Sequence, residues 1–100
     1  MVASLAQLGP TGPAGLGSRL MTASPRERFR SALSGPDVVF APLALDPLNA
    51  LIAEQAGFGA VYLSGGALGF QYAVGEAQLT STEIADAARR ITARCDLPLI

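Results

Sequence analysis

The alternation of short apolar runs with longer helix-like stretches is the feature of this 100-residue sequence that most constrains its fold. Three apolar runs are too short for helices and are typical of buried parallel strands. They occupy residues 38–40, 60–63 and 97–100. Strands that alternate with helices across short links are joined by right-handed crossovers and form a parallel sheet. The sequence therefore predicts an α/β fold in which a short helix precedes a β-α-β-α-β series.

The stretches around these runs carry helix start signals. Ser24 suits the N-cap of the first helix, and Glu27 completes a capping box with it. Thr80 and Glu83 form a second capping box at the start of the last helix. Three helices are therefore expected, two of which open with a capping box.

The middle helix is expected in the sequence DPLNALIAEQAG. Asp46 caps it, which explains this carboxylate without any chemistry, and Gly57 stops it. Leu48, Leu51 and Ile52 line one face of this helix.

Composition excludes several classes of function. The net charge of −1, with no basic cluster, argues against nucleic acid as a partner. The absence of histidine excludes a His/Cys metal site and a Ser-His-Asp triad, and the one cysteine excludes a disulfide within the chain. No apolar run approaches the roughly 18–20 residues that span a bilayer, so no membrane partner is expected. These features predict a cytoplasmic protein, in which Cys95 is a small buried hydrophobe on the apolar face of the last helix.

Residues 1–24 differ from the rest of the chain. The stretch LGPTGPAGLGS is rich in glycine and proline and cannot hold a regular element. A disordered N-terminal extension is therefore expected at 1–24; a transit peptide is disfavoured because Arg19 is the one positive charge before Arg26. Residues 25–100 are expected to be the N-terminal portion of a larger domain that is cut in its third strand. Two and a half β-α units would leave a sheet edge exposed, so a (β/α)8 barrel of roughly 250 residues is the expected whole.

The candidate site is the Ser-Gly-Gly at residues 64–66, where the second apolar run ends. Ligands of parallel α/β folds bind beyond the carboxyl ends of the strands. Gly65 and Gly66 leave their N–H groups open to a ligand, and Ser64 adds a hydroxyl donor. Such a group suits a carboxylate or phosphate oxygen, although plain turn chemistry would also explain the two glycines. The stretch is no Walker A loop, and no helix is expected directly after the glycines, as a dinucleotide fingerprint requires.

The stretch LDPLNALIAEQAGFGAVYLSGG, followed by LTSTEIADAARRITARCDLPLI, resembles the isocitrate lyase/phosphoenolpyruvate mutase superfamily. The resemblance covers residues 26–100, and the Tyr-Leu-Ser-Gly-Gly form is most similar to that of the 2-methylisocitrate lyases. It implies a TIM barrel that binds Mg²⁺ and forms homotetramers. The main Mg²⁺ ligands and the catalytic cysteine of the lyases would lie beyond Ile100, so the fragment alone is expected to be inactive.

The resemblance also implies roles for single residues. The Ser64 hydroxyl and the amides of Gly65 and Gly66 would bind the carboxylate of a 2-oxo acid or its enolate. Tyr62 stands where the family has an aromatic residue, although simple packing would also account for it. Glu76 is the nearest candidate for the family's acidic residue that is linked to the metal through water. Here the loop has Glu in place of Asp and is one residue short, so a solvated loop carboxylate is the alternative.

The expected activity is Mg²⁺-dependent carbon–carbon cleavage of a 2-hydroxy di- or tricarboxylate. The 2-methylisocitrate type would yield pyruvate and succinate through a 2-oxo acid enolate. Oxaloacetate decarboxylation and phosphonate formation of the phosphoenolpyruvate mutase type use the same enolate. A noncatalytic family member that acts as a binding module is a further alternative. A flavodoxin-like domain is disfavoured because APLAL, after the first apolar run, has no glycine.

Overall fold

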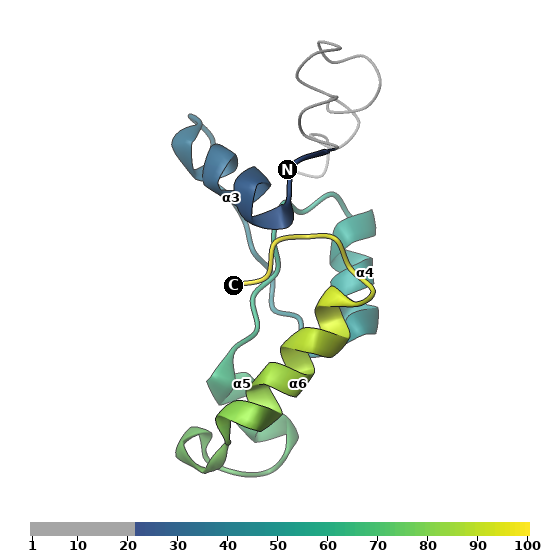
Figure 1. Ribbon diagram of the computed structural model, residues 1–100. Helices are drawn as coiled ribbons and strands as arrows, with labels where there is room; N and C mark the ends of the chain where they lie inside the picture. The colour runs from purple at the N-terminus through teal and green to yellow at the C-terminus, as the bar shows by residue number, and fades with distance from the viewer. Residues whose placement is uncertain (1–21) are drawn as a thin grey trace.

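The computed structural model describes residues 22–100, which form helices around three extended segments (Figure 1). The helices are α3 (Pro25–Ser34), α4 (Pro47–Gln55), α5 (Gly65–Gln71), the short 3-10 helix η1 (Glu76–Gln78) and α6 (Ser81–Thr92). The extension expected at 1–24 lies, for residues 1–21, outside the described residues. Within residues 22–100, no helix is long and apolar enough to cross a lipid bilayer.

The two predicted capping boxes are confirmed. At α3, Ser24 Oγ accepts from the Glu27 amide at 3.2 Å, and Glu27 Oε2 accepts from the Ser24 amide at 2.8 Å. At α6, Thr80 Oγ1 accepts from the Glu83 amide at 3.1 Å, and Glu83 Oε2 accepts from the Thr80 amide at 2.9 Å. Two otherwise unpaired amides are thus satisfied at each helix start, which places both helices where the sequence predicts them.

Helix α4 begins and ends as predicted. Asp46 Oδ1 accepts from the Asn49 amide at 2.8 Å, so this carboxylate is a helix cap. Gly57 follows the helix with φ of 95°, in the left-handed region that glycine adopts without strain. The Gly57 amide donates to Glu54 O and the Phe58 amide donates to Ala53 O, which is the hydrogen-bond pair of a Schellman motif.

The expected strand series is not confirmed, because no described residue belongs to a regular β-strand. Three extended segments are instead joined by two isolated parallel bridges, Leu43 with Tyr62 and Val61 with Leu99. Segment 60–63 is the central one. The Tyr62 amide donates to Pro42 O on one side and the Val61 amide donates to Pro98 O on the other, both at 2.9 Å. The pairing is therefore parallel and too short for strands.

The prediction of a buried strand at residues 38–40 is wrong. Val38 is 76% exposed and Phe40 is 53% exposed, and the first paired segment lies further along, at 42–44. Pro42 lacks an N–H, but a parallel pairing there needs only its carbonyl oxygen, so the proline does not prevent it. The β-branched and aromatic run at 38–40 favours a strand by propensity, whereas the segment that pairs includes a proline.

The core between α4, α6 and the extended segments consists largely of small side chains. Its buried cluster comprises Ala44, Ala50, Ala53, Val61, Ile91 and Cys95. The buried residues of α4 are Ala50 and Ala53, whereas Leu48 and Ile52 of the predicted apolar face are 68% and 55% exposed. Alanines let the backbones approach closely. Within the described residues, the face of α4 that carries Ala50 and Ala53 is therefore the one that packs.

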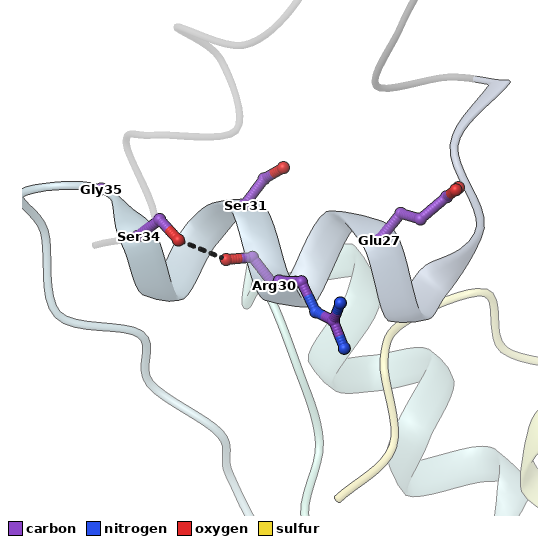
Figure 2. Close-up of a pocket in the computed structure, with 5 residues that line it drawn as sticks. All are labelled: Glu27, Arg30, Ser31, Ser34 and Gly35. Atoms are coloured by element: carbon purple, nitrogen blue, oxygen red, sulfur yellow. Dashed lines mark hydrogen bonds between the residues drawn. The ribbon is translucent and has the colours of Figure 1, made fainter.

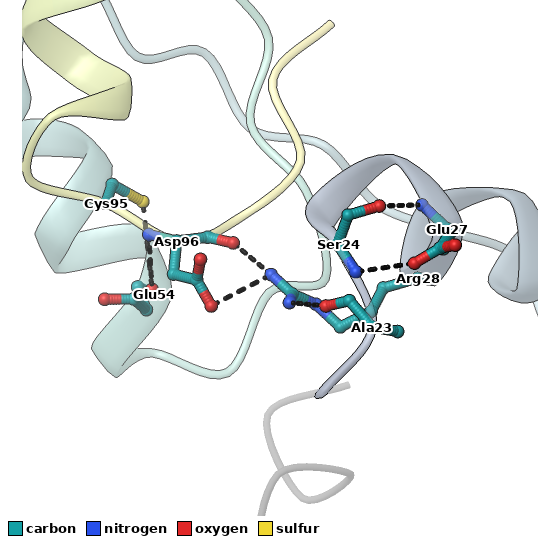
Figure 3. Close-up of polar contacts among 7 residues, drawn as sticks. All are labelled: Ala23, Ser24, Glu27, Arg28, Glu54, Cys95 and Asp96. Carbon is teal, nitrogen blue, oxygen red and sulfur yellow. Dashed lines mark hydrogen bonds and ion pairs between the residues drawn. The ribbon is translucent and has the colours of Figure 1, made fainter. Parts of the chain in front are cut away.

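Helix α3 buries no residue and is held by polar contacts (Figure 3). The Arg28 guanidinium donates to Ala23 O at 2.8 Å and to Asp96 O, and pairs with Asp96 Oδ2 at 3.1 Å. The Asp96 amide in turn donates to Glu54 Oε2 at 3.1 Å. These contacts connect α3 to the segment after α6, and that segment to α4.

Candidate functional site

The Ser-Gly-Gly stretch begins a helix, where the sequence predicts a loop. Ser64 is the N-cap of α5, and its Oγ accepts from the Ala67 amide at 3.1 Å. Three of the seven residues of α5 are glycines, which disfavour helix by about 1 kcal/mol each, so propensity argues against it. Contacts cap the helix at both ends: Ser64 at its start, and the turn at Ala73 after its last residue.

Three donors remain open at the start of α5. No hydrogen bond from the Gly65 or Gly66 amide is found within the described residues. The Ser64 hydroxyl accepts from Ala67 through its oxygen and keeps its own hydrogen for donation. The glycines carry no Cβ that would cover these groups. The hydroxyl and both amides therefore lie together where the central extended segment ends.

The Glu76 carboxylate lies against the same two glycines. Its Oε1 is 2.7 Å from the point that a Cβ on Gly65 would occupy, and its Oε2 is 3.6 Å from the corresponding point on Gly66. Ser64 Oγ is 3.8 Å from that second point. The structure thus brings Ser64, Gly65, Gly66 and Glu76 together, although twelve positions separate the serine from the glutamate.

The turn that returns the chain to α5 explains how Glu76 reaches this place. The Ala73 amide donates to Phe70 O at 3.1 Å and the Val74 amide donates to Gly69 O at 2.9 Å, a second Schellman motif. Ala73 holds its left-handed position with φ of 59°, which is unusual for a residue with a side chain.

A capping contact orients the start of η1 after this turn. Gln78 Oε1 accepts from the Gly75 amide at 2.8 Å, which fixes the backbone on the N-terminal side of Glu76. The turn and this contact together direct the Glu76 side chain back along α5.

Tyr62 lies on the other side of the central segment from the packed core. Its neighbour Val61 is fully buried, whereas Tyr62 is 45% exposed. Successive side chains of an extended segment point in opposite directions, so the Tyr62 ring points away from the side on which Val61 packs. Packing in the core of the described residues does not account for this tyrosine.

The described residues do not form a magnesium site by themselves. No group of three or more His, Cys, Asp or Glu side chains among residues 22–100 could hold a metal ion. Near the three open donors, Glu76 supplies a carboxylate, which is one ligand of the kind that Mg²⁺ prefers.

Cys95 has the predicted buried role. It is 4% exposed and its Sγ donates to Ala50 O at 3.6 Å. Burial raises the pKa of the thiol, with a smaller contribution from the nearby Glu54 carboxylate, so the thiolate is disfavoured. It lies just after α6 rather than within it, and it plays no part in the group around Ser64.

Two shallow recesses lie elsewhere in the described chain. One, of about 420 Å³, is lined by Glu27, Arg30, Ser31, Ser34 and Gly35 of α3 and its end (Figure 2). The other, of about 180 Å³, lies between α4, the end of α5 and α6. The first has a single helix as its wall, and neither is lined by residues 64–66.

The chemistry available at the start of α5 is anion binding by neutral donors. A hydroxyl and two free amides can each give a hydrogen bond to a carboxylate or enolate oxygen without bringing a charge of their own. Glu76 adds a negative charge beside them. An anionic ligand there would be repelled by this carboxylate unless a cation lay between the two, since like charges a few ångströms apart repel.

The sequence is similar to several 2-methylisocitrate lyases. It is 42% identical over 74 residues to the enzyme of Bacillus subtilis, and the match covers 73% of this chain and 25% of that protein. It is 36% identical over 83 residues to the enzyme of Salmonella typhimurium, covering 77% of this chain and 27% of that protein. The chain thus spans about a quarter of the length of the curated relatives it matches. No family model matches the chain.

The structure is similar to a crystal structure of phosphonopyruvate hydrolase in complex with oxalate and Mg²⁺. The TM-score is 0.72 at 35% sequence identity, and the match covers 77% of this chain and 28% of that one.

Proposed function

The chain belongs to the isocitrate lyase/phosphoenolpyruvate mutase superfamily, and from that membership we propose a carbon–carbon lyase of the 2-methylisocitrate type. The full-length protein would be a (β/α)8 barrel that cleaves 2-methylisocitrate to pyruvate and succinate. Breaking the carbon–carbon bond leaves the enolate of a 2-oxo acid, so the reaction needs fixed donors around a developing negative charge. Within the described residues, the group around Ser64 offers such donors.

The observation that carries this proposal is the pair of unbonded amides beside a hydroxyl that keeps its hydrogen for donation. The Gly65 and Gly66 amides belong to the backbone of α5, and the Ser64 oxygen is held by the Ala67 amide, so the three donors need little reorganisation when a ligand arrives. They would donate to the carboxylate of the 2-oxo acid or to its enolate. Tyr62, exposed at the end of the same segment, is the further substrate contact that the resemblance suggests.

Magnesium enters the proposal through the relatives. The phosphonopyruvate hydrolase complex holds oxalate with Mg²⁺, and oxalate is a planar dianion of the size of a pyruvate enolate. When bound, Mg²⁺ would neutralise part of the enolate charge. The described residues do not supply its ligand set, and Glu76 is proposed to contact the ion through water.

The test is pyruvate release by the full-length protein from 2-methylisocitrate with Mg²⁺. We expect wild-type activity, and a fall in kcat of about 100- to 1,000-fold in S64A, the cost of removing one preorganised donor to a developing oxyanion. S34A is the matched control, because Ser34 lies on exposed α3 and donates only to Arg30 O within that helix. Absence of pyruvate release, or full activity of S64A, would contradict the proposal.

Phosphonopyruvate hydrolysis is a second candidate, which the structural similarity to phosphonopyruvate hydrolase favours. Its products are pyruvate and phosphate, and the same three donors would hold the 2-oxo acid. Parallel assays of phosphate release from phosphonopyruvate and of carbon dioxide release from oxaloacetate separate these reactions from the lyase. Oxalate binding without turnover of any of the three substrates would support a noncatalytic binding module.

The assembly is part of the proposal as well. The resemblance implies a homotetramer, and we expect light scattering of the full-length protein to give four times the mass of one chain. A monomer would contradict that part without affecting the proposed reaction.

A further inference from the structure

We infer that Gly69 is a positioning residue, whose missing side chain lets the backbone of 74–76 lie against α5 and hold the Glu76 carboxylate beside Gly65 and Gly66. Its importance for catalysis rests on the proposed function, whereas its effect on the place of Glu76 does not. Nothing in the linear sequence around Gly69 indicates this role, because the contact is made by residues of another element.

The distances around Gly69 carry the inference. A Cβ on Gly69 would lie 2.9 Å from Val74 O, 3.3 Å from Glu76 N and 3.5 Å from Glu76 Cα. All three atoms belong to the backbone, so none can move aside by a change of rotamer. Gly69 O also accepts from the Val74 amide at 2.9 Å. Residues 74–76 therefore contact Gly69 both at its carbonyl oxygen and at the place of its missing side chain.

The geometry at Gly65 is different and shows what Gly69 makes possible. Gly65 lies one helical turn before Gly69, so the two share a face of α5. The Glu76 backbone crosses α5 at Gly69, and the Glu76 side chain extends back to Gly65. At Gly65 a Cβ would meet the far end of a flexible side chain, which can move, whereas at Gly69 it would meet backbone.

An alanine at position 69 therefore has a specific expected effect. The backbone at 74–76 must move away from α5, and the Glu76 carboxylate moves with it. Elsewhere in α5, replacing a glycine by alanine would favour the helix. Helix propensity alone predicts that G69A stabilises α5, whereas the contacts of Gly69 predict that it displaces Glu76.

The direct test is glycine-selective NMR of the full-length protein in wild type, G69A, E76Q and G69A/E76Q. In the wild-type background, E76Q removes a carboxylate beside Gly65 and Gly66, so we expect the resonances of both amides to shift. In the G69A background, we expect E76Q to leave these resonances unchanged, because the carboxylate has already moved away. The same shift in both backgrounds would overturn the inference, since a merely structural glycine would leave the effect of E76Q intact.

G59A is the matched control, because a Cβ at Gly59 meets no atom within 4 Å. In that background E76Q should shift both amides as it does in wild type. If G69A does not fold, insertion of one glycine between Ala73 and Val74 lengthens the turn without adding a side chain to α5. We expect this insertion to abolish the E76Q shift as well, and retention of the shift would contradict the inference.

Activity supplies a second measurement that depends on the proposed function. We expect G69A to lower kcat/KM on the order of 10- to 100-fold, the cost of a misplacement of about 1 Å at a site. The G69A/E76Q variant should be no worse than the more damaged single variant. An inactive wild type would overturn the proposed function and leave the NMR test valid, whereas additive losses in an active enzyme would overturn the role of Gly69 alone.

Discussion

Helices α4 and α5 end with the same hydrogen-bond pattern, yet they use different residues at the position that needs a left-handed backbone. Gly57 takes this position after α4 with φ of 95°, and Ala73 takes it after α5 with φ of 59°. The first end is visible in the sequence because glycine is the usual residue there. The second is invisible, because alanine at this position contradicts the rule. The residue after α4 thus indicates where that helix ends, whereas the end of α5 is held by contacts between Gly69 and the backbone of residues 74–76.

The difference extends to the two regions as a whole. Helices α4 and α6 share a cluster of buried side chains. The region from α5 to η1 depends on close backbone contacts, above all at Gly69 and around the turn at Ala73. The first region should therefore respond to changes of side-chain volume, and the second to changes at glycines and turns.

The largest expected effect is in the side-chain region. Ile91 of α6 is 1% exposed in the buried cluster, so I91A should lower the free energy of unfolding by about 2–5 kcal/mol. I52A is the control, because Ile52 is 55% exposed on α4 and its truncation should have a small effect. Urea denaturation measures both. Similar losses in the two variants would show that the exposed face of α4 is packed in solution.

The two Schellman motifs can be compared directly. G57A places a Cβ in the left-handed region, so it should destabilise the protein by about 1–2 kcal/mol. Thermal unfolding followed by circular dichroism gives the size of the effect. An unchanged stability would mean that the end of α4 also tolerates alanine, and the contrast between the two ends would disappear.

The caps provide an intermediate effect. T80A removes the hydroxyl that accepts from the Glu83 amide, so it should cost about 1 kcal/mol. T92A is the matched control, because the Thr92 hydroxyl donates only to carbonyls of its own helix, Ala88 O and Arg89 O. Chemical denaturation should show a lower free energy of unfolding in T80A alone. Equal losses of stability in the two variants would contradict the conclusion that the capping box determines where α6 begins.

Ala73 should respond in the opposite direction. A73G relieves the left-handed strain but gives the unfolded chain more freedom, so a net gain of a few tenths to about 1 kcal/mol is expected. A67G, in the first turn of α5, is the control and should destabilise. Melting temperatures measured side by side would contradict this account if A73G were the less stable variant.

The smallest effect concerns Asp86. Hydrogen bonding from Arg89 lowers the pKa of Asp86, with further help from Arg90, whose Nε lies 2.9 Å from Asp86 Oδ2. The folded pKa is depressed, so the stabilisation is present above the ordinary pKa of about 3.9 and is lost as the pH falls through the folded value. D86N should weaken this acid dependence slightly, and high salt should reduce the difference. Unfolding curves between pH 2 and pH 6 that coincide for D86N and wild type would contradict the ion pair.

The sequence predicts well the parts that side chains determine. Both capping boxes, the Asp46 cap and the burial of Cys95 were predicted and are confirmed. The pairing of the extended segments was predicted less well. A β-branched apolar run at 38–40 was expected to be buried, whereas the chain pairs at 42–44, beside a proline.

In the candidate site too, the sequence predicts some features well and others not. Ser64, Gly65 and Gly66 were selected from sequence because two glycines after an apolar run leave their amides open, and in the structure these amides are unbonded. Helix α5 was missed because its glycines disfavour helix, although Ser64 is a good N-cap and was a usable signal. The role of Gly69 could not be predicted, because it depends on a backbone approach between residues of two elements.

The start of α5 is proposed to bind the oxygen atoms of a 2-oxo acid. Titration of the full-length protein with oxalate and Mg²⁺, followed by glycine-selective NMR, tests it most directly. We predict that the Gly65 and Gly66 amide resonances move together, with a dissociation constant equal to the inhibition constant of oxalate in the pyruvate assay, while Gly59 stays unchanged. Oxalate that saturates and inhibits the enzyme without moving the two amides would contradict the claim.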